Sequence, residues 1–305
     1  MGKNIGFIST RFAGTDGVSL EAAKWAKLLW DRQHVSYWFA GELDRDPKAS
    51  MLVPEAFFDH EEVRWINQRV FGVKHRTSEI SGHIHAMRNY LKGRLYEFID
   101  KFDIHIIIPQ NVLSIPMHIP LGLAVTELIG ETGIPAIAHH HDFFWERVRF
   151  SLNAVQDYIQ MAFPPKLPSI QHVVISTLAQ EDLALRTGIS ATVIPNVLDF
   201  ENEPQVDLEY SKNFRQEIGL AEGDILILQP TRIVQRKGIE HAIELVSQLK
   251  DPKYKLVISH EAGDEGYDYA HFVEEHARGH NVDLRLVSCH IGETRGLNEK
   301  GEKVY

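Results

Sequence analysis

The stretch that decides the fold begins with the apolar run Ile225-Leu-Ile-Leu228 and continues through the loop Pro230-Thr-Arg-Ile-Val-Gln-Arg-Lys-Gly238. It then enters residues 239–249, whose apolar side chains recur at i, i+3, i+4, i+7 and i+10. That spacing predicts a helix with one buried face. A strand, a polar loop and a helix in this order predict a βαβ unit of a parallel sheet. A helix at residues 267–278 separates two further predicted strands of this part, at 255–258 and 284–287.

The N-terminal part of the chain shows the same alternation. Residues 5–8 and 35–39 are predicted strands, and a glycine-bearing loop at 12–17 leads into a helix with Ser19 as its N-cap. The remaining elements predicted here are a helix at 87–102, a strand at 104–108, a helix at 121–129 and strands at 135–138, 173–176 and 193–194. The acidic stretch at 199–207 is typical of a connection between domains.

This pattern predicts an α/β protein of two Rossmann-like lobes with parallel sheets. The predicted domains are an N-terminal lobe at residues 1–197 and a C-terminal lobe at 198–305. A complete doubly wound sheet has about six strands, whereas the second lobe shows only three predicted ones. We therefore expect the second lobe to be truncated.

The composition argues against several classes of protein. The chain has 305 residues, and its 32 Lys and Arg against 42 Asp and Glu give a net charge of −10. An acidic chain with no basic block argues against nucleic acid or an anionic membrane as the main partner. A spanning helix needs about 18 consecutive apolar residues, and no stretch approaches that length. The single cysteine, Cys289, allows no internal disulfide and favours a reducing compartment, so we expect a cytoplasmic protein.

Three loops lie where a parallel sheet binds ligands, beyond the carboxyl ends of its strands. Gly14-Thr-Asp-Gly17 precedes a predicted helix, and it is either an anion-binding loop or a plain tight turn. His139-His-His-Asp142 follows a predicted strand. Consecutive side chains of a strand alternate between its faces, so three imidazoles cannot share one metal there. A zinc site would need His139, His141 and a distant ligand, and no His-Glu-x-x-His helix supports it. The other interpretations are a structural role and a polar substrate contact, and the position of the loop favours the contact.

The third loop carries Arg232 and Lys237, five residues apart before a predicted helix. Two cations at a helix N-terminus can bind a diphosphate and stabilise it as a leaving group, although a solvated pair of surface cations is the plain alternative. Asp44-Arg-Asp46 fits the D-x-D pattern of metal-dependent transferases, but so short an acidic pattern arises easily by chance. We therefore expect no metal and no other cofactor.

Several motifs, taken in their order along the chain, resemble those of one enzyme family. They are Gly14-Thr-Asp-Gly-Val-Ser19, His141-Asp142, Val174-Ile-Ser176, Val193-Ile-Pro-Asn196-Val-Leu-Asp199, Phe214-Arg-Gln-Glu-Ile-Gly-Leu220, and Arg232 with Lys237-Gly238. Together they resemble the retaining GT-B glycosyltransferases of the large family that includes sucrose, sucrose-phosphate and mannosyl-conjugate synthases. The family's pair of glutamates, seven residues apart, would lie beyond Tyr305.

The resemblance implies roles for particular residues. Arg232 and Lys237 would hold the donor diphosphate, and His141 would hydrogen-bond the transferred sugar; these three are the predicted catalytic residues. The other implied contacts are Gly14 and Gly17 with the same phosphates, His290 and Ile291 with the nucleobase, and Thr15, Asp16 and Asp142 with the acceptor or the sugar.

The predicted function is therefore transfer of a hexose, with retention, from a nucleotide-diphosphate sugar to a small soluble or cytosolic acceptor hydroxyl. Membrane association is not expected, because the N-terminus lacks a basic amphipathic helix. The alternatives are a nucleotide-sugar epimerase or a phosphorylase on the same fold, and an inactive nucleotide-binding fragment. The sequence leaves the donor base, the sugar, the acceptor and the oligomeric state open.

Overall fold

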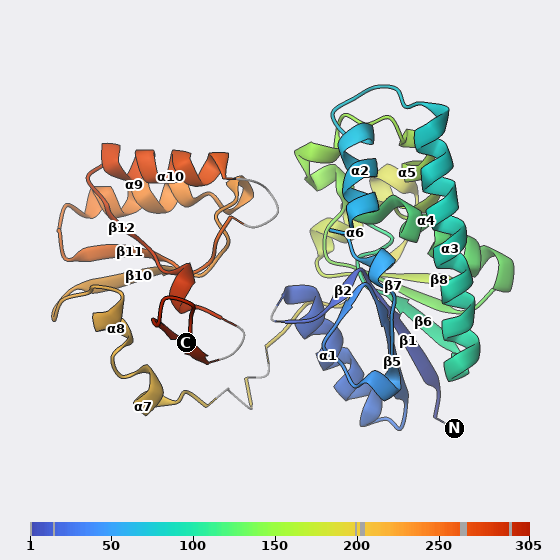
Figure 1. Ribbon diagram of the computed structural model, residues 1–305, viewed down its shortest axis with the longest axis horizontal. Coiled ribbons are helices and arrows are strands. Elements are labelled where there is room, and N and C mark those ends of the chain that lie inside the picture. The colour runs from blue at the N-terminus through green and yellow to red at the C-terminus, as the bar shows by residue number, and fades with distance from the viewer. Residues whose placement is uncertain (1, 15, 199, 202–204, 263–266, 293–294) are drawn as a thin grey trace. The chain divides into compact units, whose positions relative to one another are not determined.

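The computed structural model describes residues 2–14, 16–198, 200–201, 205–262, 267–292 and 295–305 (Figure 1). The chain folds into two compact units, Met1–Leu198 and Asp199–Tyr305. Both are built from parallel strands and helices, which confirms the predicted α/β fold.

The first unit is organised around a parallel sheet. Its strands are β1 (Asn4–Ile8), β3 (Val35–Ala40), β5 (Ser50–Leu52), β6 (Ile106–Pro109), β7 (Ala136–His140), β8 (Ile170–Val174) and β9 (Ala191–Val193). In the described part of this unit their order is β5-β3-β1-β6-β7-β8-β9, and every neighbouring pair is parallel. The short strands β2 (Arg11–Phe12) and β4 (Glu42–Leu43) pair separately. The carboxyl ends of the sheet strands therefore share one edge.

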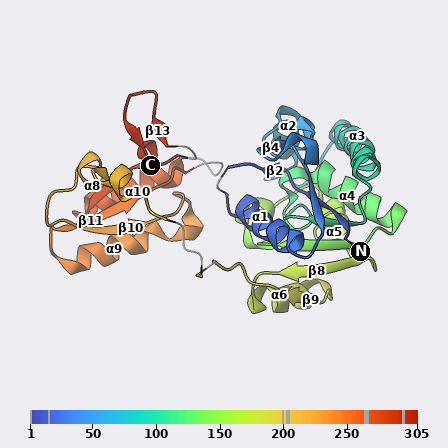
Figure 2. The same cartoon turned by 90° about the horizontal axis from the view of Figure 1, so that it is seen from below.

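Helices cover both faces of this sheet (Figures 1 and 2). They are α1 (Gly17–Trp30), α2 (Glu61–Val70), α3 (Ser78–Phe102), α4 (Ile119–Thr132), α5 (Gln156–Ala162) and α6 (Thr177–Thr187). Helix α1 packs on one face, where Phe7 stacks on Trp38 with ring centroids 4.7 Å apart. Helices α3 and α4 bury the opposite face, around Phe39 and Ile107. Apolar side chains on both faces explain why these strands read as nearly continuous apolar runs.

The predicted N-cap of α1 was wrong. Asp16 has extended backbone angles (φ −68°, ψ 152°), and its carboxylate accepts from the N–H groups of Val18 and Ser19 at 3.0 and 3.2 Å. Ser19 lies inside the first turn instead, and its hydroxyl donates to Asp16. Helix α3 also begins nine residues earlier than the predicted residue 87, at Ser78, because the Thr77 side chain caps it.

Replacing Asp16 with alanine should destabilise the first unit. Loss of an N-cap side chain costs about 1 kcal/mol of the free energy of unfolding. Ser19→Ala is the matched comparison, because the Ser19 hydroxyl bonds the capping carboxylate rather than the helix backbone. Urea unfolding of both variants measures the difference, and a larger loss in Ser19→Ala would show that the cap is assigned to the wrong residue.

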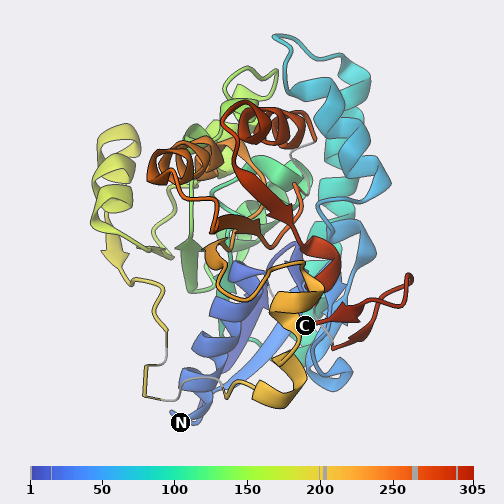
Figure 3. The same ribbon diagram turned by 90° about the vertical axis from the view of Figure 1, so that its left-hand side faces the viewer.

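The second unit has a smaller parallel sheet (Figure 3). Its strands are β10 (Ile225–Gln229), β11 (Tyr254–Ile258) and β12 (Asp283–Leu286), and they pair in that order across the described residues. One face is buried by α9 (Ile239–Leu249) and α10 (Asp268–Gly279). The short helices α7 (Leu208–Ser211) and α8 (Phe214–Glu217) precede the sheet, and the hairpin strands β13 (Gly296–Leu297) and β14 (Lys303–Val304) follow it.

Among the described residues, no helix is both long enough and apolar enough to span a lipid bilayer.

Candidate functional site

In the first unit, the loops after β6 and β7 bring His141 into a polar cluster. Its backbone N–H donates to Asn111 Oδ1 at 3.0 Å. Its ring Nε2 lies 3.1 Å from Gln110 Oε1, and its Nδ1 lies 3.2 Å from Asn196 Nδ2. Both ring nitrogens of His141 therefore have protein partners. The residue is half-buried, and part of its side chain reaches solvent.

Burial lowers the pKa of His141, and the carboxylates of Asp142, Glu21 and Asp16 oppose this only in part. The imidazole is therefore neutral at neutral pH. A neutral ring both donates and accepts hydrogen bonds, which suits contact with sugar hydroxyls.

The Asp142 carboxylate is bound on both oxygens. Asn111 Nδ2 donates to Oδ1 at 3.0 Å, and Arg147 Nε donates to Oδ2 at 2.7 Å. Asn111 is held at φ 60°, a left-handed conformation that asparagine tolerates better than most residues. These contacts show that Asp142 stabilises the turn beside His141. Asn111 and Arg147 were not predicted from the sequence. The predicted contact of Asp142 with acceptor or sugar stays a prediction.

In the loop before α1, two carboxylates bind backbone N–H groups of the described residues. The Gly14 N–H donates to Asp44 Oδ2 at 2.8 Å, and Asp16 occupies the first turn of the helix. Gly14 has φ 68°, and Gly17 begins the helix. A phosphate that binds the N–H groups of Gly14, Val18 and Ser19 would have to displace these carboxylates. Thr15 lies outside the described residues.

The two acids of the D-x-D pattern have structural roles. Asp44 binds the Gly14 N–H, and the Asp46 side chain accepts from Lys48 N at 2.9 Å. Across the described residues, no group of three or more His, Cys, Asp or Glu side chains is arranged to hold a metal ion.

In the second unit, Arg232 and Lys237 lie on the loop between β10 and α9. The loop ends in a short 3-10 turn (Gln235–Lys237), followed by Gly238 at φ 59°. Arg232 is half-buried and Lys237 is exposed. Both cations therefore lie at the carboxyl end of β10 and close to the positive end of the α9 dipole.

Tyr269 of α10 also reaches this helix start. Its hydroxyl accepts from Ile239 N at 3.0 Å and donates to the carboxylate of Glu240. Burial, followed by the bond to Glu240, raises the pKa of Tyr269 to about 12, and the same bond lowers the pKa of Glu240. A pocket of about 470 Å³ lies beside this pair, lined by Ile233, Val234, Gln235, Glu240, Asp268, Tyr269 and Phe272. No sequence motif indicated Tyr269.

The remaining predicted contacts follow β12. His290 ends a 3-10 turn (Ser288–His290), its Nδ1 lies 3.1 Å from Lys303 O, and its carbonyl accepts from Tyr305 N at 2.8 Å. Ile291 packs on the sheet face opposite α9 and α10. Both residues lie at the carboxyl edge of the sheet, as do Arg232 and Lys237.

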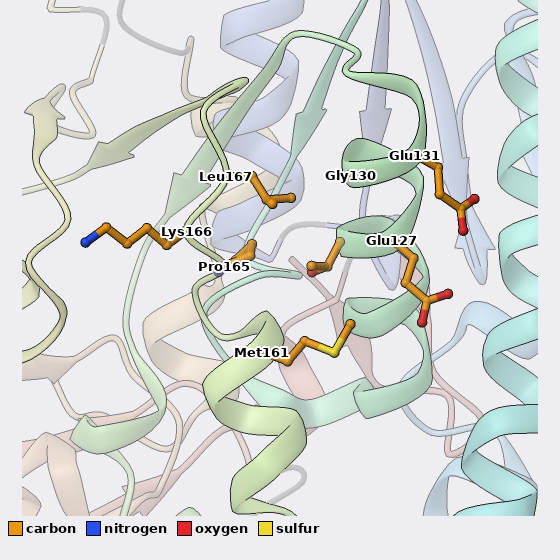
Figure 4. A pocket seen from close by; sticks show the side chains of 8 residues that line it. Glu127, Gly130, Glu131, Met161, Pro165, Lys166 and Leu167 are labelled. Atoms are coloured by element: carbon orange, nitrogen blue, oxygen red, sulfur yellow. The ribbon is translucent and has the colours of Figure 1, made fainter.

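A further pocket, of about 360 Å³, contains none of the predicted site residues (Figure 4). It lies between α4 and the segment 165–167, and Figure 4 shows Met161 and Leu167 on its wall. Glu127 and Glu131 at its rim are ion-paired with Lys92 at 2.9 and 2.6 Å.

Parallel sheets packed against helices define the Rossmann-like class of fold. Comparison with known proteins identifies the family within that class. No family model matches the chain. Over 304 residues it is 30% identical to a mannosylglucosylglycerate synthase of Petrotoga mobilis, covering 93% of this chain and 69% of that protein. It is 34% identical to the Thermotoga maritima protein of the same name over 255 residues, 81% of this chain and 57% of that protein.

Two solved structures show the same fold at low identity. Sucrose-phosphate synthase from Thermosynechococcus elongatus has a TM-score of 0.61 and 12% identity over 93% of this chain and 70% of that one. Anabaena HepE, solved with UDP and glucose, has a TM-score of 0.56 and 14% identity over 93% and 69%. The chain belongs to the GT-B glycosyltransferases, enzymes that transfer a sugar from a nucleotide-sugar donor. The family predicted from the ordered motifs is thereby confirmed.

Proposed function

We propose that this protein transfers a hexose, with retention of anomeric configuration, to a hydroxyl of a small soluble glycoside. The observation that carries the proposal is the identity with two mannosylglucosylglycerate synthases over most of this chain. Their name describes a product that joins mannose, glucose and glycerate. The proposed donor is therefore a nucleotide-diphosphate mannose, and the proposed acceptor is a glucoside of glycerate.

The proposed donor contacts lie on the second unit. Arg232 and Lys237 bind the diphosphate through charge-assisted hydrogen bonds and stabilise it as negative charge develops on the leaving group. Their position at the start of α9 supports this role, because the helix dipole adds to the attraction. His290 and Ile291, at the end of β12, contact the nucleobase. We propose that these cations and the dipole suffice without a metal ion or another cofactor.

The proposed sugar contact on the first unit is His141. Its neutral, half-buried ring supports a hydrogen bond to the transferred hexose. Asp16 of the Gly14–Gly17 loop and Asp44, which binds the Gly14 N–H, place carboxylates here that suit the hydroxyls of an acceptor better than a phosphate. The departing phosphate accepts the proton of the attacking hydroxyl, so this proposal needs no side-chain base. The single cysteine, Cys289, is exposed and unpaired among the described residues, which supports a cytoplasmic location.

Product analysis by NMR tests this proposal. The protein is incubated with nucleotide-diphosphate mannose and the glucoside of glycerate, and the one-bond carbon–proton coupling at the anomeric carbon of the new glycoside is compared with that of the donor. We expect release of nucleoside diphosphate and the same anomeric configuration in donor and product. An altered nucleotide sugar formed without acceptor would identify an epimerase, and an inverted product would contradict retention.

A further inference from the structure

The buried side-chain amide of Gln110 lies between the rings of His139 and His141. Gln110, just after β6, is the parallel partner of His139 in β7, and both side chains are 0% exposed. The Gln110 Oε1 lies 3.0 Å from His139 Nδ1 and 3.1 Å from His141 Nε2. One carbonyl oxygen thus meets both rings.

This arrangement favours one position for the His141 proton. A carbonyl oxygen has two lone pairs and no proton, so it accepts from both imidazoles. His141 then carries its proton on Nε2, and its Nδ1 presents a lone pair. The amide nitrogen of Asn196, 3.2 Å from Nδ1, requires the same tautomer because it can only donate.

We propose that Gln110 is a positioning residue that holds His141 in the Nε2-protonated tautomer, so that Nδ1 accepts a hydrogen bond from a substrate hydroxyl. The role of Nδ1 toward substrate rests on the proposed function, whereas the tautomer does not. Asn196 is exposed, so a hydroxyl can take its place at Nδ1 with little rearrangement of the core.

Neighbouring residues hold the backbone of Gln110 and the ring of His139. Its backbone N–H donates to Ile8 O at 2.8 Å, and its carbonyl accepts from Ser9 Oγ at 3.2 Å. Trp25 stacks on His139 with ring centroids 4.5 Å apart and holds that ring against the amide. The Gln110 backbone and the His139 ring are therefore both held in place, and the amide oxygen between the two rings contacts His141 from the buried side.

Stability alone does not account for this cluster. Among the described residues, Gln110 Nε2 and His139 Nε2 are buried without a hydrogen-bond partner. Buried polar atoms without partners are rare and cost stability. A core of apolar side chains would avoid that cost, so the amide is better explained by its effect on His141.

The direct test is the tautomer itself, which needs no substrate. Long-range proton–nitrogen correlation spectra of histidine-labelled protein report which ring nitrogen is protonated, and the signal lost in His141→Gln assigns the residue. We expect the Nε2-protonated pattern in the wild type. The comparison is made in an Asn196→Ala background, because the Asn196 amide alone favours the same tautomer. There, Gln110→Met, which keeps the length and removes the acceptor, should make the two nitrogen shifts converge. Gln110→Glu, whose carboxylate accepts from both rings, should restore the pattern.

A wild-type His141 protonated on Nδ1, or a pattern that Gln110→Met leaves unchanged in the Asn196→Ala background, would overturn the proposal. If that double variant does not fold, Asn196→Ala alone decides it, because Gln110 should then keep Nε2 protonated by itself, and loss of the pattern would overturn the proposal. Gln171→Met, on the exposed part of β8, is the matched control and should leave the His141 signals unchanged.

Measurement of kcat and KM distinguishes a failure of this proposal from a failure of the proposed function. We expect Gln110→Met to lower kcat by up to about tenfold, the value of one neutral hydrogen bond, while KM for the donor stays the same. If the tautomer changes as expected but neither Gln110→Met nor His141→Gln affects transfer, the positioning role stands and the sugar contact of His141 is wrong.

Discussion

Arg232→Ala is expected to weaken binding of the nucleotide-diphosphate donor by about 10- to 100-fold, because a hydrogen bond to a charged group contributes about 1.5–3 kcal/mol. Lys237→Ala should have a similar effect, since both cations lie on the loop that leads into α9. The effect should fall on nucleotide diphosphates and be much smaller for the nucleoside alone. Titration calorimetry with both ligands measures it.

The matched control is Arg278→Ala. It removes one positive charge from the same unit, but at the C-terminal end of α10. Donor affinity should then change little. Unchanged donor affinity in both Arg232→Ala and Lys237→Ala would show that the diphosphate does not bind at this loop.

The first unit is expected to lose stability steeply as the pH falls below about 6.5. The cause is a set of four histidines buried in the neutral form. Burial lowers the pKa of His118 and His172 to about 4, that of His139 to about 3, and that of His140 well below its usual value. The unfolded chain takes up protons near its ordinary pKa of 6.5, whereas the folded chain does not.

The direction of the pH dependence follows from this difference in proton uptake between the unfolded and the folded chain. Between pH 6.5 and about 4 the unfolded state binds more protons, so each histidine lowers the free energy of unfolding by up to about 1.4 kcal/mol per pH unit. Above pH 6.5 their stabilising effect is fully present. Urea unfolding at pH 7.5, 6.5 and 5.5 measures the slope. A flat profile from pH 7.5 to 5.5 would contradict burial of these rings in neutral form.

His118 offers a specific check of this account. Its Nδ1 accepts from Leu121 N at 3.1 Å, while its Nε2 lies 2.8 Å from the carbonyl of Glu55, so a second proton would break the helix cap. In His118→Asn the new side chain can still accept the hydrogen bond of the helix cap, but it does not titrate. The free energy of unfolding of this variant should therefore depend less steeply on pH than that of the wild type, by a slope that corresponds to at most one proton. An unchanged slope would show that His118 is not among the titrating groups.

The elements that the sequence predicted well are those in which local pattern and tertiary packing agree. Strands β1 and β10 are short apolar runs, and the apolar positions of α9 repeat at helical spacing. The start of α3 was missed, although Ile80 and Ile84 continue the spacing of Met87 and lie on the same buried face. That signal was present in the sequence.

Other features depend on residues that are distant in sequence. The choice of Asp16 over Ser19 as N-cap depends on which residue first adopts extended backbone angles. Gln110 joins the site because β6 and β7 are neighbours, and only the strand order shows this. Tyr269 reaches the start of α9 from α10 across 30 positions of sequence. Motif spacing carries no information on such contacts.

The central claim is that this chain binds a nucleotide-sugar donor without a metal, and a thermal-shift titration in EDTA tests it most directly. The protein is melted with UDP, GDP or ADP and with their common sugars. One nucleotide family should raise the melting temperature, because ligand at 100 times Kd adds about 2.7 kcal/mol to the free energy of unfolding. Cooperative melting with no shift for any of these ligands would contradict the claim.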